Sequence, residues 1–273
     1  DSAAMVGDYQ FSSSLATAGV AANDDYAGTI QGAAPIKLNK GQGELRGVLE
    51  NSADTDIFKF TVPAAGRMLV RLSYGSSVPA ARLTMLGVDG RETGTLVDTG
   101  TKGLWEYTAE GGKEVYLRLD SLGEGDQSYT LSIAADEETG IAQLARVISP
   151  DAAGAVLDGA IQLAGDADLL AVDTTLDGRL IARLDPRGSI FATRLEILDQ
   201  SGRVLATGTL DAQFRQQANL VVTPGQRYFV RVTGDDGATG RYQLQVRQIA
   251  DDQPDLPSLA KTDLQLAQST TGA

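Results

Sequence analysis

The chain has 273 residues, with no cysteine and no histidine, and its 36 acidic against 23 basic residues give a net charge of −13. These counts exclude disulfides and thiolate metal sites, and they remove the commonest general base and transition-metal ligand. The negative charge disfavours nucleic acid and anionic lipid as partners and favours cations. No apolar run approaches the roughly 20 residues that a membrane span needs, so we expect none.

The first 23 residues are rich in Ala, Ser and Gly, with Tyr9, Phe11 and Leu15 as period-two apolar positions. This pattern is typical either of an extended arm with one strand-like face or of a disordered tail. The chain begins at Asp1 without Met and without a charged-then-apolar segment. We therefore expect a mature product whose export signal was removed, or part of a longer protein.

Between Asp24 and about Ile249 the same sequence pattern occurs twice. The segment 47–71 returns as 159–183, an offset of 159 − 47 = 112 residues, and each copy has an Asp-x-Asp pair, an alternating apolar run and a Gly-Arg turn. Such self-similarity indicates tandem units of one fold. The expected organisation is an N-terminal arm (1–23), repeat one (24–135), repeat two (136–249) and a C-terminal tail (250–273).

Each copy consists of short alternating runs bounded by turn residues, such as 57–62 and 68–72 in repeat one. Asp89-Gly90 and Ser201-Gly202 mark tight turns. About eight strands per copy, with turns every 8–12 residues, predict an antiparallel β-sandwich. Only the window 141–148 has a helical spacing. The predicted fold class is therefore all-β, with two tandem antiparallel β-sandwich domains and extended terminal arms.

The tail opens with Asp251-Asp252, as each repeat opens with an acidic pair, and then offers Leu264 and Leu266 among its apolar residues. It reads as the start of a third copy. An incomplete strand can satisfy its backbone by adding to the open edge of a neighbouring subunit, and head-to-tail addition of this kind does not close. Self-association through the terminal arms into a filament is thus predicted.

Several residues together carry a family resemblance. The pattern of Asp24-Asp25-Tyr26, Gly47, Asp54-x-Asp56 and Tyr129-x-Leu131 resembles the bacterial pre-peptidase C-terminal domain, and the second copy resembles it with Glu137 in place of the second Asp and Leu170 in place of Phe58. The resemblance covers about residues 24–249. It implies a jelly-roll-like β-sandwich that accompanies secreted bacterial proteins, has no activity of its own, and in some relatives binds collagen, carbohydrate or calcium.

Two acidic clusters are the candidate metal sites. Calcium takes six to eight oxygen ligands, and the clusters converge if the leading segment of each repeat folds back over its first strand pair. The resemblance to calcium-binding relatives supports the same assignment. The alternative is that each Asp-x-Asp pair only caps a turn. The predicted ligands are Asp24, Asp25, Asp54 and Asp56 in repeat one and Asp136, Glu137, Asp166 and Asp168 in repeat two.

Other candidate sites are weaker. Asp98-Thr99-Gly100 matches the Asp-Thr-Gly of aspartic proteases, but a dyad needs a second carboxylate at an equivalent position, and Asp173 belongs to a different strand. Trp105 and Tyr107 suit a sugar platform or, more commonly, a sandwich core. No catalytic residue is assigned.

The sequence thus predicts a secreted, non-enzymatic bacterial protein, extracellular or at the cell surface, with a structural or adhesive role. Calcium is the one cofactor indicated, and a polysaccharide or protein ligand is possible beside self-association. The alternative function is an accessory carbohydrate- or protein-binding region of a larger secreted hydrolase or peptidase.

Overall fold

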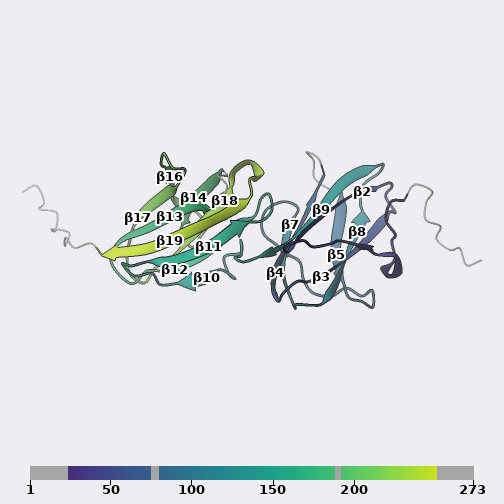
Figure 1. The fold of residues 1–273 in the computed structure, drawn as a ribbon, viewed down its shortest axis with the longest axis horizontal. Coiled ribbons are helices and arrows are strands. Elements are labelled where there is room, and N and C mark those ends of the chain that lie inside the picture. Colours follow the sequence, from purple (N-terminus) through teal and green to yellow (C-terminus); the bar gives the residue numbers. More distant parts are fainter. Residues whose placement is uncertain (1–23, 75–79, 188–191, 251–273) are drawn as a thin grey trace, which may run out of the picture.

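A computed structural model describes residues 24–74, 80–187 and 192–250. Nearly every regular element in these ranges is a β-strand, and the strands form four sheets that pack as two sandwiches. Figure 1 shows the two sandwiches end to end along the long axis of the molecule. The prediction of an all-β fold is confirmed.

The first sandwich contains nine strands among its described residues. They are β1 (Ala34–Pro35), β2 (Gln42–Leu49), β3 (Thr55–Thr61), β4 (Gly66–Ser73), β5 (Ala81–Leu86), β6 (Val97–Asp98), β7 (Leu104–Ala109), β8 (Glu114–Ser121) and β9 (Gln127–Asp136). One sheet has the order β1-β3-β8-β5 and the other the order β2-β9-β4-β7-β6. A short 3-10 helix, η1 (Ile30–Gly32), precedes β1.

The second sandwich repeats this topology and adds one edge strand, β15. Its strands are β10 (Arg146–Ile148), β11 (Ala155–Ile161), β12 (Ala167–Asp173), β13 (Gly178–Arg187), β14 (Thr193–Leu198), β15 (Val204–Thr207), β16 (Thr209–Leu210), β17 (Gln216–Val222), β18 (Arg227–Gly234) and β19 (Gly240–Ala250). The sheet orders are β10-β12-β18-β14-β15 and β11-β19-β13-β17-β16. A second 3-10 helix, η2 (Asp235–Gly237), follows β18.

Strand β3 is buried on both faces. Alternation along the strand points Phe58 and Phe60 into the core between the sheets, where they are 0% and 3% exposed. Ile57 points the other way and is buried as well, because the segment around η1 and β1 covers it together with Tyr116. Polar side chains that enter at the start of this strand are therefore removed from water.

The leading segment of each repeat lies against the strand that carries the Asp-x-Asp pair. The Ile57 N–H donates to the Ala27 carbonyl at 3.2 Å, and the Leu169 N–H donates to the Thr139 carbonyl at 2.8 Å. These contacts occupy equivalent positions in the two copies. They bring the acidic opening of each repeat next to the acidic pair that follows it.

Two expectations are corrected in detail. The window 141–148, which has a helical spacing, forms a turn and then the strand β10, because the backbone of 146–148 pairs with the edge of β12. Leu144 and Val147 of this window are 52% and 48% exposed. The sheets are also not wholly antiparallel: β1 and β10 pair in parallel with β3 and β12. These short edge strands lie in the leading segments and satisfy their backbone groups at the sheet edge.

Two strands extend by one residue across the predicted domain boundaries. Asp136, assigned to repeat two, is the last residue of β9, and Ala250, assigned to the tail, is the last residue of β19. The terminal arms lie outside the described residues, as do their predicted anchors Tyr9, Phe11, Leu15, Leu264 and Leu266. Among the described residues no helix has the length and apolar character to cross a membrane.

A repeated glycine lies under a repeated tyrosine. Gly47 of β2 is opposite Tyr129 of β9, and Gly159 of β11 is opposite Tyr242 of β19. A Cβ on Gly47 would lie 2.3 Å from the Tyr129 hydroxyl oxygen, and one on Gly159 would lie 2.5 Å from that of Tyr242. Both positions are therefore restricted to glycine by the close approach of the ring.

We predict that Gly47→Ala destabilises the first sandwich by about 1–3 kcal/mol, the usual cost of forcing an extra group into a packed site. The measurement is chemical denaturation of the parent and the variant. In a Tyr129→Leu background the same alanine should cost less, because the ring that it meets is gone. Equal costs in the two backgrounds would contradict the packing explanation.

Candidate metal centres

The local fold brings the paired aspartates to one place. Asp56 and Asp168 are the second residues of β3 and β12, and Asp54 and Asp166 precede them by two positions. Residues two apart in an extended segment point to the same side, so each pair presents two carboxylates together. The leading segment then adds the carboxylate of Asp24 or Asp136.

We call Asp24, Asp25, Glu50, Asp54 and Asp56 the first centre. Oxygens of Asp24, Asp54 and Asp56 lie within 4.8 Å of one another, and so do oxygens of Asp24, Asp25 and Glu50. Backbone amides orient two of these groups: the Val48 N–H donates to Asp25 at 2.9 Å and the Glu50 N–H donates to Asp54 at 3.1 Å. All four residues predicted in repeat one are thus brought together.

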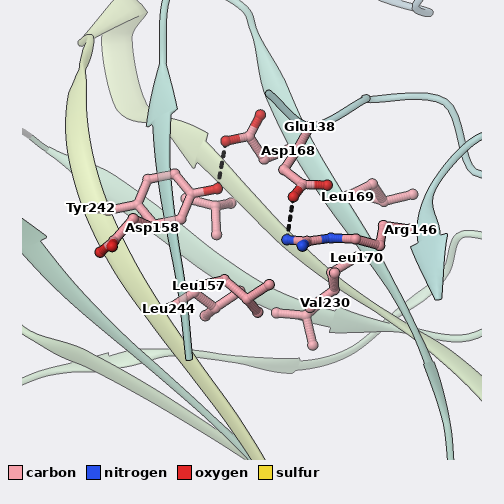
Figure 2. A pocket seen from close by; sticks show the side chains of 11 residues that line it. Glu138, Arg146, Leu157, Asp158, Asp168, Leu169, Leu170, Val230, Tyr242 and Leu244 are labelled. Carbon is pink, nitrogen blue, oxygen red and sulfur yellow. Dashed lines mark hydrogen bonds and ion pairs between the residues drawn. The ribbon is translucent and has the colours of Figure 1, made fainter. Parts of the chain in front are cut away.

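We call Asp136, Asp166 and Asp168 the second centre, and their oxygens also lie within 4.8 Å of one another. Glu137, predicted as a fourth ligand, lies outside this group and accepts a hydrogen bond from the Gln162 side chain. Figure 2 shows Glu138 beside the centre, paired with Arg146. The Glu138–Arg146 pair has no counterpart in the first repeat, where Tyr26 and Ala34 occupy the equivalent positions.

A tyrosine binds the innermost carboxylate of each centre. The Tyr129 hydroxyl donates to Asp56 Oδ2 at 2.5 Å, and the Tyr242 hydroxyl donates to Asp168 Oδ2 at 2.5 Å (Figure 2). Asp56 is 0% exposed and Asp168 4% exposed, and the Oδ1 atom of each is buried with no hydrogen-bond partner. Buried carboxylate oxygens are normally paired, so two equivalent oxygens without a partner, one in each copy, require an explanation.

Burial and mutual repulsion disfavour the charged forms of these acids. Burial raises the pKa of Asp56 to about 8; the Tyr129 hydrogen bond opposes this shift, and the charges of Asp54, Asp25 and Asp24 add to it. Burial likewise raises the pKa of Asp136 to about 8 and that of Asp166 to about 7. The pKa of Asp168 lies well above its usual range, through burial and then through the charge of Asp166.

The turn-capping alternative accounts for only half of each pair. Asp54 and Asp166 do cap: each Oδ2 accepts the backbone N–H of the residue four positions earlier, at 3.1 Å and 2.9 Å. Asp56 and Asp168 instead face the tyrosines and the other carboxylates. Capping thus explains the first aspartate of each pair and leaves the second to another role.

The donor set suits a hard cation. Carboxylate and carbonyl oxygens are the ligands of calcium and magnesium, and a chain without cysteine or histidine offers no soft donors. The buried, unpartnered Oδ1 atoms of Asp56 and Asp168 supply the free lone pairs that such an ion requires. A bound divalent cation would also relieve the repulsion that raises the pKa values.

Sequence reasoning missed several contributors. Glu50 belongs to the first centre, but its counterpart is Gln162, so the repeat gave no signal for it. Tyr129 and Tyr242 occupy corresponding positions in the two copies, but the sequence did not indicate that they hydrogen-bond to aspartates. Arg67 lies with its Nε 3.9 Å from Asp136 Oδ2, a contact between repeats that no motif marks.

The remaining sequence candidates have structural roles. Asp98 is exposed at the end of β6, where it accepts the Gly100 N–H at 2.8 Å, and Asp173 is paired with Arg227 at 2.6 Å. Tyr107 is 4% exposed in the first core, and Trp105 is partly buried against it. These positions support the core interpretation of the two aromatic residues.

Comparisons with known proteins give only distant similarity. No protein-family model and no curated protein matches this chain. The pre-peptidase C-terminal domain of a collagenase from Bacillus anthracis is similar at 20% identity and a TM-score of 0.32, over 38% of this chain and 94% of that domain. PliG from Aeromonas hydrophila, a periplasmic inhibitor of g-type lysozyme, is similar at 13% identity and a TM-score of 0.31, over 37% and 94%.

A third solved structure, the CUB1-EGF-CUB2 domains of rat MASP-1, is similar at 12% identity and a TM-score of 0.23, over 78% of this chain and 99% of that one. We derive no function from likeness at these levels. The resemblance to the pre-peptidase C-terminal domain extends to a β-sandwich architecture.

The raised pKa values predict how stability depends on pH without calcium. A carboxyl whose folded-state pKa exceeds its unfolded value contributes stability below the unfolded pKa, and this contribution is lost as pH rises through the folded pKa. With a folded pKa of about 8 for Asp56, the melting temperature in chelator should fall from pH 5 to pH 8 by at least about 4 °C, or roughly 1–2 kcal/mol.

Asp56→Asn should reduce the fall in the melting temperature of the first sandwich between pH 5 and pH 8, because the amide side chain has no charge to bury. The matched control is Asp126→Asn, which makes the same change at an exposed position of that sandwich and should keep the parent profile. Calorimetry at several pH values in chelator measures both. A parent that becomes more stable between pH 5 and pH 8 would contradict the prediction.

Proposed function

We propose that this protein is a secreted, non-enzymatic bacterial chain of two β-sandwich modules that bind calcium and serve a structural or adhesive role. The observation that supports this proposal most directly is the pair of buried carboxylates, Asp56 and Asp168, each with one unpartnered oxygen and each in a group of three carboxylates. A fold that places such a group twice at equivalent positions suits a ligand that supplies positive charge.

Calcium suits the centres better than magnesium does. Magnesium demands near-ideal octahedral geometry and keeps several waters, whereas calcium accepts irregular sets of six to eight oxygens. The first centre gathers five carboxylates on three separate segments, and Asp25 is exposed, so water can complete the shell. This wide, irregular set fits the larger ion.

The first centre is the stronger of the two in this proposal. It contains Glu50 where the second has the neutral Gln162. Asp136 of the second centre is paired with Arg67, and the neighbouring Glu138 is paired with Arg146. Positive side chains compete with a bound cation, and carboxylate count tunes calcium affinity. We therefore expect the first centre to fill at lower calcium concentration than the second.

The second candidate function is an accessory carbohydrate- or protein-binding region of a larger secreted hydrolase. A groove of about 370 Å³ between the two sandwiches favours it, because ligand sites occur preferentially at domain interfaces. The groove is lined by the apolar side chains of Leu169, Leu198 and Phe229 and by the polar side chains of Thr101 and Arg231. The net charge of −13 disfavours nucleic acid as the partner in either case.

Millimolar calcium should raise the melting temperature of the first sandwich by at least about 5 °C, because a ligand at 100 times its Kd stabilises by about 2.7 kcal/mol. Asp56→Asn should lose most of this rise. Asp126→Asn, the matched control, should keep it. Scanning calorimetry with calcium and with chelator gives the comparison. A parent protein whose melting temperature is the same with calcium and with chelator would contradict the proposal.

Self-association through the terminal arms remains a prediction, since the arms lie outside the described residues. Light scattering and electron microscopy on the full chain should show species larger than a monomer. Variants lacking 1–23 or 251–273 should be monomeric if either arm inserts into a neighbour. A monodisperse monomer at full length with calcium present would instead favour the accessory-module alternative.

A further inference from the structure

The loop that forms part of the second centre is packed on the first sandwich. Three carbonyls of loop 162–166 accept hydrogen bonds from side chains of repeat one: Gln162 O from Gln42, Ala164 O from Arg71 and Gly165 O from Thr101. Leu163 joins a cluster with Leu69, Leu104 and Ala134 of the first sandwich. Four successive residues of the loop, 162–165, therefore contact the first sandwich. Asp166, which ends this loop, is therefore positioned by both repeats.

Asp136 belongs to both repeats at once. It is the last residue of β9 and lies opposite Arg67 of β4, within a sheet of the first sandwich. Its carboxylate nevertheless lies within 4.8 Å of those of Asp166 and Asp168, at the start of β12 in the second sandwich. The second centre is consequently assembled from two sandwiches, and one of its three carboxylates is carried by the first.

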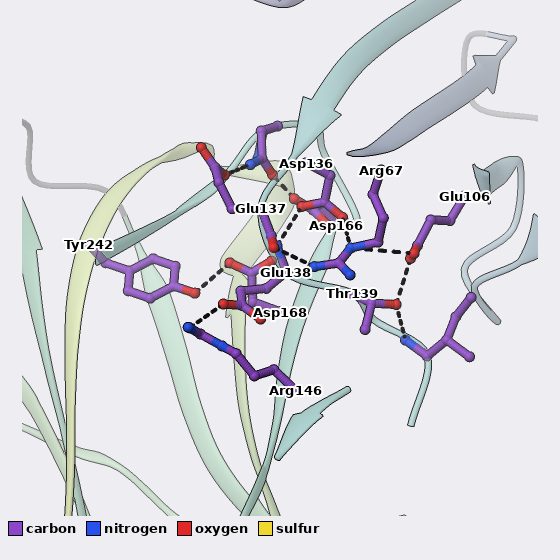
Figure 3. A network of polar contacts seen from close by, with 12 residues as sticks. Arg67, Glu106, Asp136, Glu137, Glu138, Thr139, Arg146, Asp166, Asp168 and Tyr242 are labelled. Atoms are coloured by element: carbon purple, nitrogen blue, oxygen red, sulfur yellow. Dashed lines mark hydrogen bonds and ion pairs between the residues drawn. The ribbon is translucent and has the colours of Figure 1, made fainter. Parts of the chain in front are cut away.

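Arg67 links the acids at this junction (Figure 3). Its Nε lies 3.6 Å from Glu106 Oε1 and 3.9 Å from Asp136 Oδ2, and its guanidinium donates to the Glu137 carbonyl. The Thr139 hydroxyl donates to Glu106 at 2.7 Å, which ties the leading segment of repeat two to β7. Repeat one thus holds the segment 136–139 through two side chains, Arg67 and Glu106.

The second copy keeps the arginine but not its acidic partner, so the fold itself does not require the pair. The counterpart of Arg67 is Arg179, which is exposed and has no salt bridge among the described residues. The counterpart of Glu106 is the exposed Asn219, because Glu106 pairs with Leu69 as Asn219 pairs with Ile181. Arg179 of β13 lies opposite Ile249, not opposite an acid. The Arg67 and Glu106 contacts are therefore specific to the junction between the sandwiches.

The arginine does not satisfy the centre. Asp168 is 4% exposed, and its Oδ1 is buried and unpartnered; Asp136 Oδ2 likewise has no hydrogen bond. Asp136 and Asp168 both belong to the group of three carboxylates whose oxygens lie within 4.8 Å of one another. Of these three acids, Arg67 forms an ion pair with Asp136, at 3.9 Å, and the buried Asp168 Oδ1 is left without a partner.

We propose that the second centre is a junction site, in which a divalent cation held by Asp136, Asp166 and Asp168 cross-links the two sandwiches and fixes their relative orientation. Arg67 is a positioning residue that holds Asp136 in place before the ion binds. An ion at the first centre, by contrast, contacts carboxylates of repeat one alone. This inference rests on the proposed calcium function and adds to it a mechanical role for the second ion.

The test measures the distance between the two sandwiches. Thr61→Cys in β3 and Val221→Cys in β17 provide exposed label positions on strands, and the chain has no other cysteine. Spin labels at these positions report the distribution of inter-sandwich distances with calcium and with chelator. Equilibrium dialysis with calcium, on the same proteins, counts the ions bound.

In the labelled Arg67→Gln variant we expect a broad distribution in chelator that collapses to that of the parent when calcium is added. Asp168→Asn in this background should lose the collapse together with one bound ion. Asp56→Asn should lose the other ion and keep the collapse. Arg179→Gln is the matched control, because it removes the equivalent arginine away from the junction, and it should behave as the parent does.

Two outcomes would overturn the junction site: an Arg67→Gln distribution that stays broad while calcium is bound at the second centre, or one that is as narrow as the parent's in chelator. Glu106→Gln, which removes the partner of Arg67, repeats the test if Arg67→Gln does not fold. Absence of calcium binding at both centres would instead refute the calcium function itself, so the two failures are distinguishable.

Discussion

The structure depends on a carboxylate placed where water cannot reach it. Asp56 and Asp168 each lie near the start of a strand that is covered on both faces, and each accepts a hydrogen bond from one tyrosine hydroxyl. Gly47 and Gly159 are restricted to glycine so that the tyrosine can approach. Burying a charge without a counter-charge is costly. The fold repeats this arrangement at equivalent positions, and the compensation that we propose is a bound cation.

The two centres have the same backbone and different electrostatics. Both use a capping aspartate, a tyrosine-bound aspartate and an acid from the leading segment. The first adds Glu50, and the second exchanges it for Gln162 and lies beside Arg67. Duplicated sites that diverge in this way can divide their roles. In our proposals the first stabilises its own sandwich, and the second joins two sandwiches.

The junction also explains why the repeats abut without a linker. Strand β9 ends at Asp136, which already serves the second repeat, so no residues remain to act as a flexible connection. The contacts of Arg71, Thr101 and Gln42 with loop 162–166 complete a polar interface around a small apolar cluster. Interfaces between domains of one chain are commonly of this mixed kind.

The all-β class, the duplication and the approximate strand positions follow from the sequence alone, because period-two alternation and turn residues such as Asp89-Gly90 are local signals. Seven of the eight predicted ligands, all but Glu137, also lie in the acidic groups of the structure, which consist largely of the Asp-x-Asp pairs and their leading acids. Tertiary structure decided the rest. Which aspartate caps a turn and which is buried against Tyr129 depends on a strand more than 70 residues away, and the contact of Arg67 with Asp136 depends on the register between β4 and β9. A local pattern shows neither which distant strands become neighbours nor the register between them, because both are set only when the sheets form and pack.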